Sequence, residues 1–270
     1  MTTSAHLDLQ VEVTGTGPTL VLLPPVGLRA WVWRPVAARL ARQRTVVAVD
    51  LPGYGSPSLP AGSPWTVDRF TDAVANFLGA RWPDPIEVAG VSLGGAIALE
   101  LARRNSVRHA VAVSPIGFWS RNEARFAVAS LRVTQRVARL SRPVRWRLAR
   151  SPIARALLLA QIVGRPRNVP AEAVAAMARD VADAPFAATL PHTGRYLFTP
   201  SADIGRRVTV AWGTRDRLLP PRQARRAHGA LPAAQHVELP GAGHVPFWDI
   251  PLQLAALILD PAGYILRTGG

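Results

Sequence analysis

One serine stands where a nucleophile is expected, between a strand and a helix. Residues 90–94 read Gly-Val-Ser-Leu-Gly, directly after the apolar run Ile86–Val91 and directly before a helical pattern that opens at Leu93. A serine on so tight a turn projects its hydroxyl above the sheet, and glycine is needed on either side because a Cβ atom would collide with its neighbours. Backbone N–H groups at the start of the helix can hold a developing negative charge. The motif therefore predicts Ser92 as a nucleophile.

A serine nucleophile needs a base, and the base needs an orienting acid. His244 is the expected base, because it lies on the glycine-rich loop 241–246 that follows the apolar run 236–239. Asp216 is the expected acid, since it comes just past the apolar run 208–212 and active sites of open α/β sheets lie at the carboxyl ends of strands. We predict Ser92, Asp216 and His244 as the catalytic residues.

The other five histidines have structural explanations. His109 and His236 open apolar runs and are expected to be structural. His6, His192 and His228 are expected at the surface or at helix ends. For His192, a position that faces a pocket is an open alternative.

The elements that must position these residues alternate between strand and helix. Apolar runs typical of strands lie at 7–13, Thr19–Leu23, Thr45–Val49, Ile86–Val91, 109–113, 208–212 and 236–239. Helical patterns lie between or after them, at 33–42, 66–81, 93–104, 221–230 and 252–259. The first two strands, joined by a Gly-Thr-Gly turn, are expected to form a hairpin. The alternation predicts a doubly wound α/β fold with a mostly parallel sheet.

Residues 116–206 break this alternation. The segment is helical by pattern, lacks convincing strands and is interrupted by prolines at 143, 152, 166, 170, 185 and 191. We interpret it as a helical cap inserted into an α/β core made of residues 1–115 and 207–270. Between residues 121 and 167 it carries 12 arginines and one acid, Glu123, so much of the chain's excess positive charge lies there.

Composition excludes several kinds of chemistry. The 270 residues contain no Cys, which removes disulfides, Cys-ligated zinc and a thiol nucleophile. All 32 basic residues are Arg, so a Schiff-base or P-loop lysine is excluded too, and the formal net charge is +15. The amino end has no basic start followed by an apolar run, and no stretch reaches the roughly 20 apolar residues of a membrane span. These features predict a cytoplasmic protein.

With these residues in this order, the chain resembles the α/β-hydrolase family. Its order of Ser92, Asp216 and His244 is the order in which that family carries its triad. Further similarities are Asp-Leu-Pro-Gly-Tyr-Gly at 50–55, Gly-Thr-Arg-Asp at 213–216 and Gly-His-Val-Pro at 243–246. The resemblance implies the family fold, a Ser/His/Asp triad that works without metal or organic cofactor, and a cap that shapes substrate choice. Asp50 is expected to hold a turn rather than to act in catalysis.

The loop after residues Thr19–Leu23 departs from the family, whose members usually carry His-Gly there. Here it reads Pro24-Pro25-Val26-Gly27, and proline has no N–H to donate. We expect the N–H groups of Val26 and Leu93 to form the oxyanion hole. The alternative register, with Pro25 in the donor position, would remove one donor. Trp31 and Trp33, just after this loop, are expected to line the pocket.

A serine at the elbow points to acyl transfer, so the expected reaction is hydrolysis of a small or lipid-like carboxylic ester through an acyl-enzyme. One alternative is a C–C bond hydrolase of the same fold, although its relatives often have Asn before the serine, where this chain has Val91. Cofactor-free perhydrolysis stays open as well. A further alternative is a catalytically weakened binding protein, suggested by Pro24 and Pro25.

The arginines of the cap suggest a partner besides the ester substrate. Arg132, Arg136 and Arg139 share one helical face, as in a helix that lies on an anionic membrane. The simpler interpretation is a solvated cap helix whose apolar side packs on its own core. Nucleic-acid binding has only the charge in its favour and is not expected. The sequence leaves the oligomeric state open.

Overall fold

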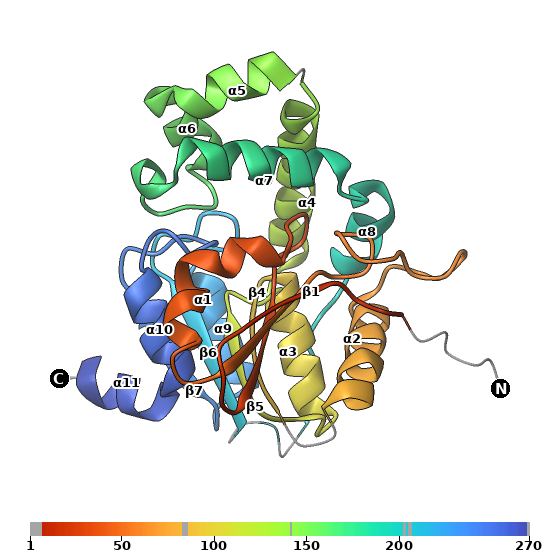
Figure 1. Ribbon diagram of the computed structural model, residues 1–270, viewed down its shortest axis with the longest axis vertical. Helices are drawn as coiled ribbons and strands as arrows, with labels where there is room; N and C mark the ends of the chain where they lie inside the picture. Colours follow the sequence, from red (N-terminus) through yellow and green to blue (C-terminus); the bar gives the residue numbers. More distant parts are fainter. Residues whose placement is uncertain (1–6, 83–85, 141, 202–203, 205–206, 269–270) are drawn as a thin grey trace.

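A computed structural model describes residues 7–82, 86–140, 142–201, 204 and 207–268 (Figure 1). His6, with the rest of the amino end, and Arg206, at the expected end of the cap, lie outside the described residues.

Within the described ranges the centre of the protein is a seven-stranded sheet in the order β1-β3-β2-β4-β5-β6-β7. Only β1 runs antiparallel to its neighbour, and the other pairs are parallel. Each apolar run expected as a strand contains one, but the first strand begins four residues later than expected, while the ends of the others shift by two residues or fewer. The strands are β1 Val11–Thr14, β2 Thr19–Leu23, β3 Thr45–Val49, β4 Ile86–Val91, β5 Val107–Val113, β6 Val208–Gly213 and β7 Gln235–Leu239.

The expected hairpin between the first two strands is wrong, because β3 lies between β1 and β2 and pairs with both. The Gly-Thr-Gly turn passes over the start of β3, where the Thr45 N–H donates to the Pro18 carbonyl at 3.1 Å. A Cβ atom on Gly15 would lie 2.4 Å from the Ala41 and Arg44 carbonyl oxygens. The glycines therefore let the connection from β1 to β2 lie close against the backbone just before β3. They do not form a tight turn between two adjacent strands.

Helices cover both faces of the sheet, which confirms the doubly wound α/β fold. Alternate residues of β2 enter the two apolar cores, with Val21 and Leu23 on one side and Leu20 and Leu22 on the other. The first core contains residues of α2 Val67–Arg81, α3 Leu93–Arg103 and α9 Arg222–Ala230. The second contains residues of α1 Arg34–Leu40 and α10 Pro251–Leu259, together with Tyr264 of α11 Pro261–Thr268, which the sequence analysis did not predict.

The chain between β5 and β6 is helical, as expected, and its described residues contain no strand. It forms α4 Arg121–Ala138, α5 Arg142–Arg150, α6 Pro152–Leu159, α7 Ala171–Asp183 and α8 Phe186–Thr193. Figure 1 shows α5, α6 and α7 stacked above the sheet at one end of the molecule, with α5 outermost. The division into core and cap at residues 116 and 206 stays a prediction.

In the parts of the chain that the structure describes, no helix is both long and apolar enough to cross a membrane.

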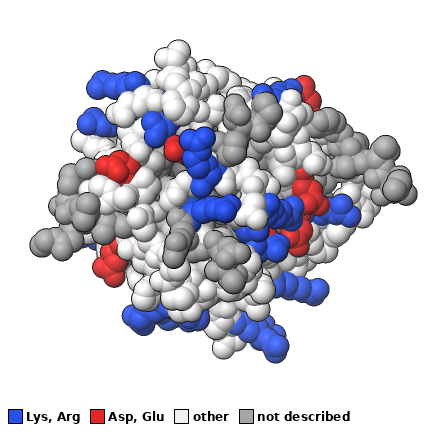
Figure 2. All heavy atoms as spheres, turned by 90° about the horizontal axis from the view of Figure 1, so that it is seen from below, with Lys and Arg blue, Asp and Glu red and all other residues white. Residues whose placement is uncertain are grey.

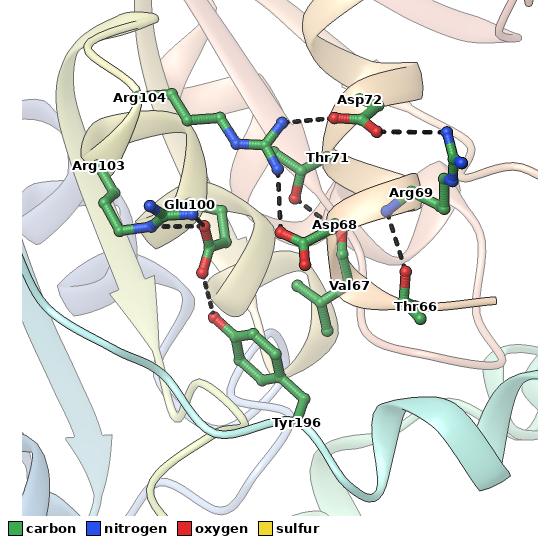
Figure 3. A network of polar contacts seen from close by, with 10 residues as sticks. All are labelled: Thr66, Val67, Asp68, Arg69, Thr71, Asp72, Glu100, Arg103, Arg104 and Tyr196. Carbon is green, nitrogen blue, oxygen red and sulfur yellow. Dashed lines mark hydrogen bonds and ion pairs between the residues drawn. The ribbon is translucent and has the colours of Figure 1, made fainter. Parts of the chain in front are cut away.

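Helix α3, which begins next to Ser92, is fixed by a polar network at its far end (Figure 3). The buried carboxylate of Glu100 accepts from the Tyr196 hydroxyl at 2.7 Å and from Arg103. Burial and the negative charge of Glu100 raise the pKa of Tyr196, so its hydroxyl stays protonated and keeps donating. Arg104 bridges to Asp68 and Asp72 of α2. The network joins α2, α3 and the chain that returns from α8 to the sheet.

Glu123 joins the start of α4 to α9. It completes a capping box with Ser120, whose N–H donates to it at 2.7 Å, and it pairs with Arg222 and Arg226. Burial by itself raises the pKa of Glu123, but the hydrogen bonds from Ser120 and Arg222 and the charge of Arg226 outweigh it and lower the pKa below its ordinary value of 4.5. The ionised carboxylate is therefore favoured in the folded protein.

We expect Glu123→Gln to destabilise the fold at neutral pH by about 1–2 kcal/mol, because the charge-assisted hydrogen bonds are lost. The loss is no larger because solvent screens both arginines, which are partly exposed. A carboxylate with a lowered pKa stabilises the fold above its unfolded-state pKa, and this contribution disappears as pH falls through the folded-state pKa. Urea unfolding of wild type and variant should therefore differ at pH 7 and converge toward pH 3. The matched control is Glu172→Gln, at an exposed glutamate of α7. A difference that stays constant with pH would contradict the ionic contribution.

Candidate active site

Ser92 sits on a sharp turn between β4 and α3. Its backbone has φ 57° and ψ −112°, a strained conformation for a residue with a side chain. A Cβ atom on Gly90 would lie 2.1 Å from the Gly94 carbonyl oxygen, and one on Gly94 would lie 2.3 Å from that of Leu23. The two flanking glycines are thus required by close backbone contact, as the motif predicts.

Asp216 and His244 come together from separate strand ends. The loop after β6 carries Asp216, whose Oδ1 accepts the N–H groups of Leu218 at 3.0 Å and Leu219 at 2.8 Å. Its Oδ2 lies 2.8 Å from Nδ1 of His244, on the loop after β7. Both side chains are buried. Because the carboxylate accepts, Nδ1 carries the hydrogen and Nε2 is left to act as an acceptor.

Ser92 and His244 line the same cavity, which has a volume of about 300 Å³. Most of its wall comes from apolar side chains of α4, α5, α6 and α7, among them Val137, Leu148, Leu159 and Met177. The few polar side chains include Ser130, Thr134, Gln161 and Arg145. The cavity thus combines one reactive group of side chains, Ser92 and His244, with a mostly apolar wall, as small-molecule sites often do.

Pro25 and Val26 also line this cavity, and Val26 and Leu93 together border a smaller hollow on which Ser92 opens. The loop turns through a hydrogen bond from the Leu28 N–H to the Pro25 carbonyl at 3.2 Å. Gly27 has φ +83°, and a Cβ atom there would lie 2.6 Å from the Phe186 ring. Val26 and Leu93 are thus beside Ser92, while their role as oxyanion donors stays a prediction.

Asp249 is a buried residue of this site that the sequence analysis missed. Its carboxylate accepts three backbone N–H groups, from Gly164 at 2.8 Å, Arg165 at 2.6 Å and Gly243 at 2.8 Å. The segment after α6 and the loop of His244 are therefore joined through one side chain. The available signal was an acid five residues after His244, in the otherwise apolar stretch 245–252.

The same two segments also meet backbone to backbone. The Val245 N–H donates to the Ile162 carbonyl at 2.7 Å. A Cβ atom on Gly164 would lie 2.2 Å from the Gly241 carbonyl oxygen, and one on Gly243 would lie 2.5 Å from the Gly164 nitrogen. Glycine on both sides allows this contact.

The four other histidines that the structure describes lie away from the cavity wall. His109 Nε2 lies 3.1 Å from the Thr209 hydroxyl, and burial lowers its pKa. His236 lies 2.8 Å from the Leu231 carbonyl and packs edge-on against His228. His192 is exposed and does not line the cavity of Ser92. These positions agree with the structural roles expected for them.

The expectation that Trp31 and Trp33 line the pocket is wrong. Trp33 is fully buried and packs edge-on against Phe247, with ring centroids 4.6 Å apart. Trp31 turns toward α7, where its Nε1 donates to Asp180 at 2.6 Å. Burial raises the pKa of Asp180, although the Trp31 hydrogen bond and the Arg29 charge oppose the shift. The two indoles therefore pack the segment after β2 against Phe247 and against α7.

Asp50 holds a turn, as expected. Its Oδ1 accepts the Ala30 N–H at 2.6 Å, and its backbone carbonyl accepts the Ser56 hydroxyl. Elsewhere in the described residues, no group of three or more His, Asp or Glu side chains could hold a metal ion.

Known proteins resemble this chain, two of them over most of its length and one over less than half of it. A pimeloyl-[acyl-carrier protein] methyl ester esterase of Chromobacterium violaceum is 32% identical over 263 residues, covering 89% of this chain and 92% of its own. A 2-hydroxy-6-oxo-2,4-heptadienoate hydrolase of Pseudomonas putida is 31% identical over 122 residues, covering 43% and 44%. The crystal structure of a membrane phospholipase A, described as a bacterial virulence factor, superposes with a TM-score of 0.70 at 25% identity, covering 95% and 87%.

The sequence profile of the alpha/beta hydrolase family matches residues 20–257. That range includes both strand ends that carry Asp216 and His244 and the turn that carries Ser92. The chain therefore belongs to the alpha/beta hydrolase family and is a hydrolase enzyme.

Proposed function

We propose that the protein hydrolyses carboxylic esters with an apolar acyl group through Ser92, His244 and Asp216. The observation that carries this proposal is the buried hydrogen bond between Asp216 and His244, 2.8 Å long, beside a cavity that Ser92 also lines. The bond between acid and base, and the cavity that the serine and the base share, support a nucleophile, a base and an orienting acid of the kind that acyl transfer uses.

In the proposed cycle, Ser92 Oγ attacks the ester carbonyl carbon and its proton passes to His244 Nε2. Asp216 orients the imidazole and stabilises its positive charge. His244 then gives the proton to the departing alcohol, which leaves an acyl group on Ser92. Water enters, loses a proton to His244 and attacks the acyl carbon, and the return of that proton to Ser92 releases the acid.

The N–H groups of Val26 and Leu93 are the proposed oxyanion donors. Leu93 is the first residue of α3, so its N–H has no carbonyl within the helix to bind. Neither N–H forms a hydrogen bond with another described residue, and both residues border the hollow beside Ser92. Val26, rather than Pro25, would then supply the donor on the side of β2.

The helical segment, proposed as a cap at residues 116–206, shapes substrate choice by supplying most of the cavity wall. Its apolar side chains favour an acyl chain over a charged or sugar-like group. The Chromobacterium relative is named for a methyl ester of an acyl group, which is consistent with this substrate class.

C–C bond hydrolysis is the second candidate, because the same triad can serve it and one relative is named for a heptadienoate substrate. Arg145, on the cavity wall, is the group that could face a substrate carboxylate. It already donates to the Ala138 carbonyl at 2.7 Å, and apolar side chains dominate the rest of the wall. The ester proposal therefore has more support.

We expect Ser92→Ala to reduce turnover of p-nitrophenyl esters, from acetate to palmitate, by about 10³-fold or more, since the nucleophile is removed. The matched control is Ser130→Ala, at another serine on the same cavity wall, which should stay within a few-fold of wild type. Because the wall is apolar, chains longer than acetate should be preferred. Equal turnover by Ser92→Ala and wild type would refute the assignment.

Replacing Val26 by proline should lower kcat by about 10²–10³-fold, because it removes the N–H of one oxyanion donor. Val26→Ala keeps that N–H and should retain most of the activity. Circular dichroism verifies that both variants fold. Equal kcat values for the two variants would show that the Val26 N–H is not an oxyanion donor.

Asp249→Asn should lower kcat by roughly tenfold while KM changes less than twofold. The amide replaces an acceptor by a donor opposite backbone N–H groups, which disturbs the loop of His244 without entering the cavity. Steady-state kinetics with the preferred ester gives both values, and Asp183→Asn, at an exposed carboxylate of α7, is the control. A change in KM alone would show that Asp249 positions the cap wall instead of the base.

A further inference from the structure

Large apolar side chains are unusually exposed on α4 and α6. Ile153 and Leu157 of α6 are 75% and 74% exposed, and they lie on one helical face because they are four residues apart. On α4, Phe126 and Val133 are each 55% exposed and share a face, seven residues apart. Single exposed apolar residues are common on protein surfaces, but neighbours on one helix face indicate a contact surface.

The cavity of Ser92 reaches this surface. Val133, Leu157 and Leu158 line the cavity and are also exposed, so they form its rim. Ile153 extends the rim along α6. We call these four residues, with the arginines of α4 next to Val133, the cap rim: Val133, Ile153, Leu157, Leu158, Arg132 and Arg136.

The arginines of these helices are not neutralised by the protein. No arginine of α4, α5 or α6 forms an ion pair with a carboxylate among the residues that the structure describes. Figure 2 shows the opposite end of the molecule, where acidic side chains lie beside several basic ones. The excess positive charge is thus available to an external anionic partner at the end where the cavity opens.

We propose that the cap rim docks on an anionic lipid bilayer, with Ile153 and Leu157 inserted at the boundary of headgroups and acyl chains and Arg132 and Arg136 among lipid phosphates. Short amphipathic helices with exposed aliphatic and basic side chains bind lipid surfaces in this way. Docking places the cavity rim against the bilayer, from which a lipid-borne ester could enter. This last step rests on the proposed ester hydrolysis, whereas docking itself does not.

Charge and apolarity together favour a bilayer over the other occupants of such a surface. A second copy of the chain in a symmetric dimer would bring the same unpaired arginines together, which is repulsive. A lipid surface satisfies both features at once, because phosphates attract the guanidinium groups and acyl chains cover the aliphatic side chains.

Flotation of the full-length protein with vesicles tests the proposal. Wild type should float with vesicles of equal parts phosphatidylglycerol and phosphatidylcholine, much less with pure phosphatidylcholine, and less at 0.5 M salt because the charges are screened. Each arginine near an anionic surface contributes roughly a fivefold gain in partitioning. Arg132→Glu/Arg136→Glu should therefore weaken partitioning at least about 25-fold, and Ile153→Asp at least about tenfold.

Two matched variants control for charge and for an exposed aliphatic residue. Arg39→Glu/Arg42→Glu reverses two exposed arginines, one in the last turn of α1 and one just after that helix, and Leu252→Asp replaces a leucine of α10 that is 59% exposed. Both should float like wild type. Thermal unfolding checks that all four variants fold, and turnover of soluble p-nitrophenyl butyrate, measured separately, should stay within twofold of wild type because none of the six positions lines the cavity.

The outcomes separate docking from catalysis. Flotation that the cap-rim variants lose and the controls keep supports docking, even if no ester is hydrolysed. Absence of flotation with intact ester turnover overturns docking and leaves the proposed function standing. Equal flotation with neutral vesicles, or equal loss in the control variants, also overturns it. A dimer in light scattering that Ile153→Asp dissociates, without flotation, assigns the surface to a second copy.

Discussion

The crowding of backbone atoms around Ser92 is the constraint on which the rest of the site depends. The turn from β4 to α3 brings Gly90 against the Gly94 carbonyl, and Gly94 against the Leu23 carbonyl, at distances that leave no space for a side chain. This packing holds Ser92 in a strained conformation beside the end of β2, where Val26 lies. The surrounding backbone contacts therefore over-determine the conformation of the turn, which is how a strained residue persists in a folded protein.

The second organising feature is the joint between the helical segment and the loop of His244. Asp249 binds N–H groups from both, and Gly164 and Gly243 let the two backbones touch. A second connection runs from α7 through Asp180 to Trp31. The segment after α6 is therefore joined directly to the loop that carries His244, and α7 is joined to the loop after β2.

Charge divides the molecule into two ends with different character. Near the amino ends of the strands, arginines meet carboxylates, as Arg104 meets Asp68 and Asp72 (Figure 3). At the other end, the one buried acid of α4, Glu123, is already bound by Arg222 and Arg226 and leaves nothing for the other arginines of its helix. Positive charge and exposed aliphatic side chains therefore accumulate where the cavity opens, which makes that end suited to an anionic, partly apolar partner.

Local sequence determined much of this protein. Continuous apolar runs located the strands, because strands of a parallel sheet are buried on both faces, and the helical period located the helices that flank the sheet. The Gly-Val-Ser-Leu-Gly turn and the residues just past two strand ends marked Ser92, Asp216 and His244, since parallel strands bring their carboxyl ends to one edge.

What depended on contacts between distant segments was decided only by the tertiary structure. The sequence did not predict that β3 pairs with both β1 and β2. A glycine-rich turn predicts that the chain reverses locally, but it does not indicate that a later strand lies between the two strands that it connects. Trp31 and Trp33 were misplaced for a similar reason, as their partners, Asp180 and Phe247, lie more than a hundred residues away. The joint at Asp249 and the exposure of Ile153 and Leu157 likewise follow from how the helical segment packs on the sheet, which no periodicity within the segment encodes.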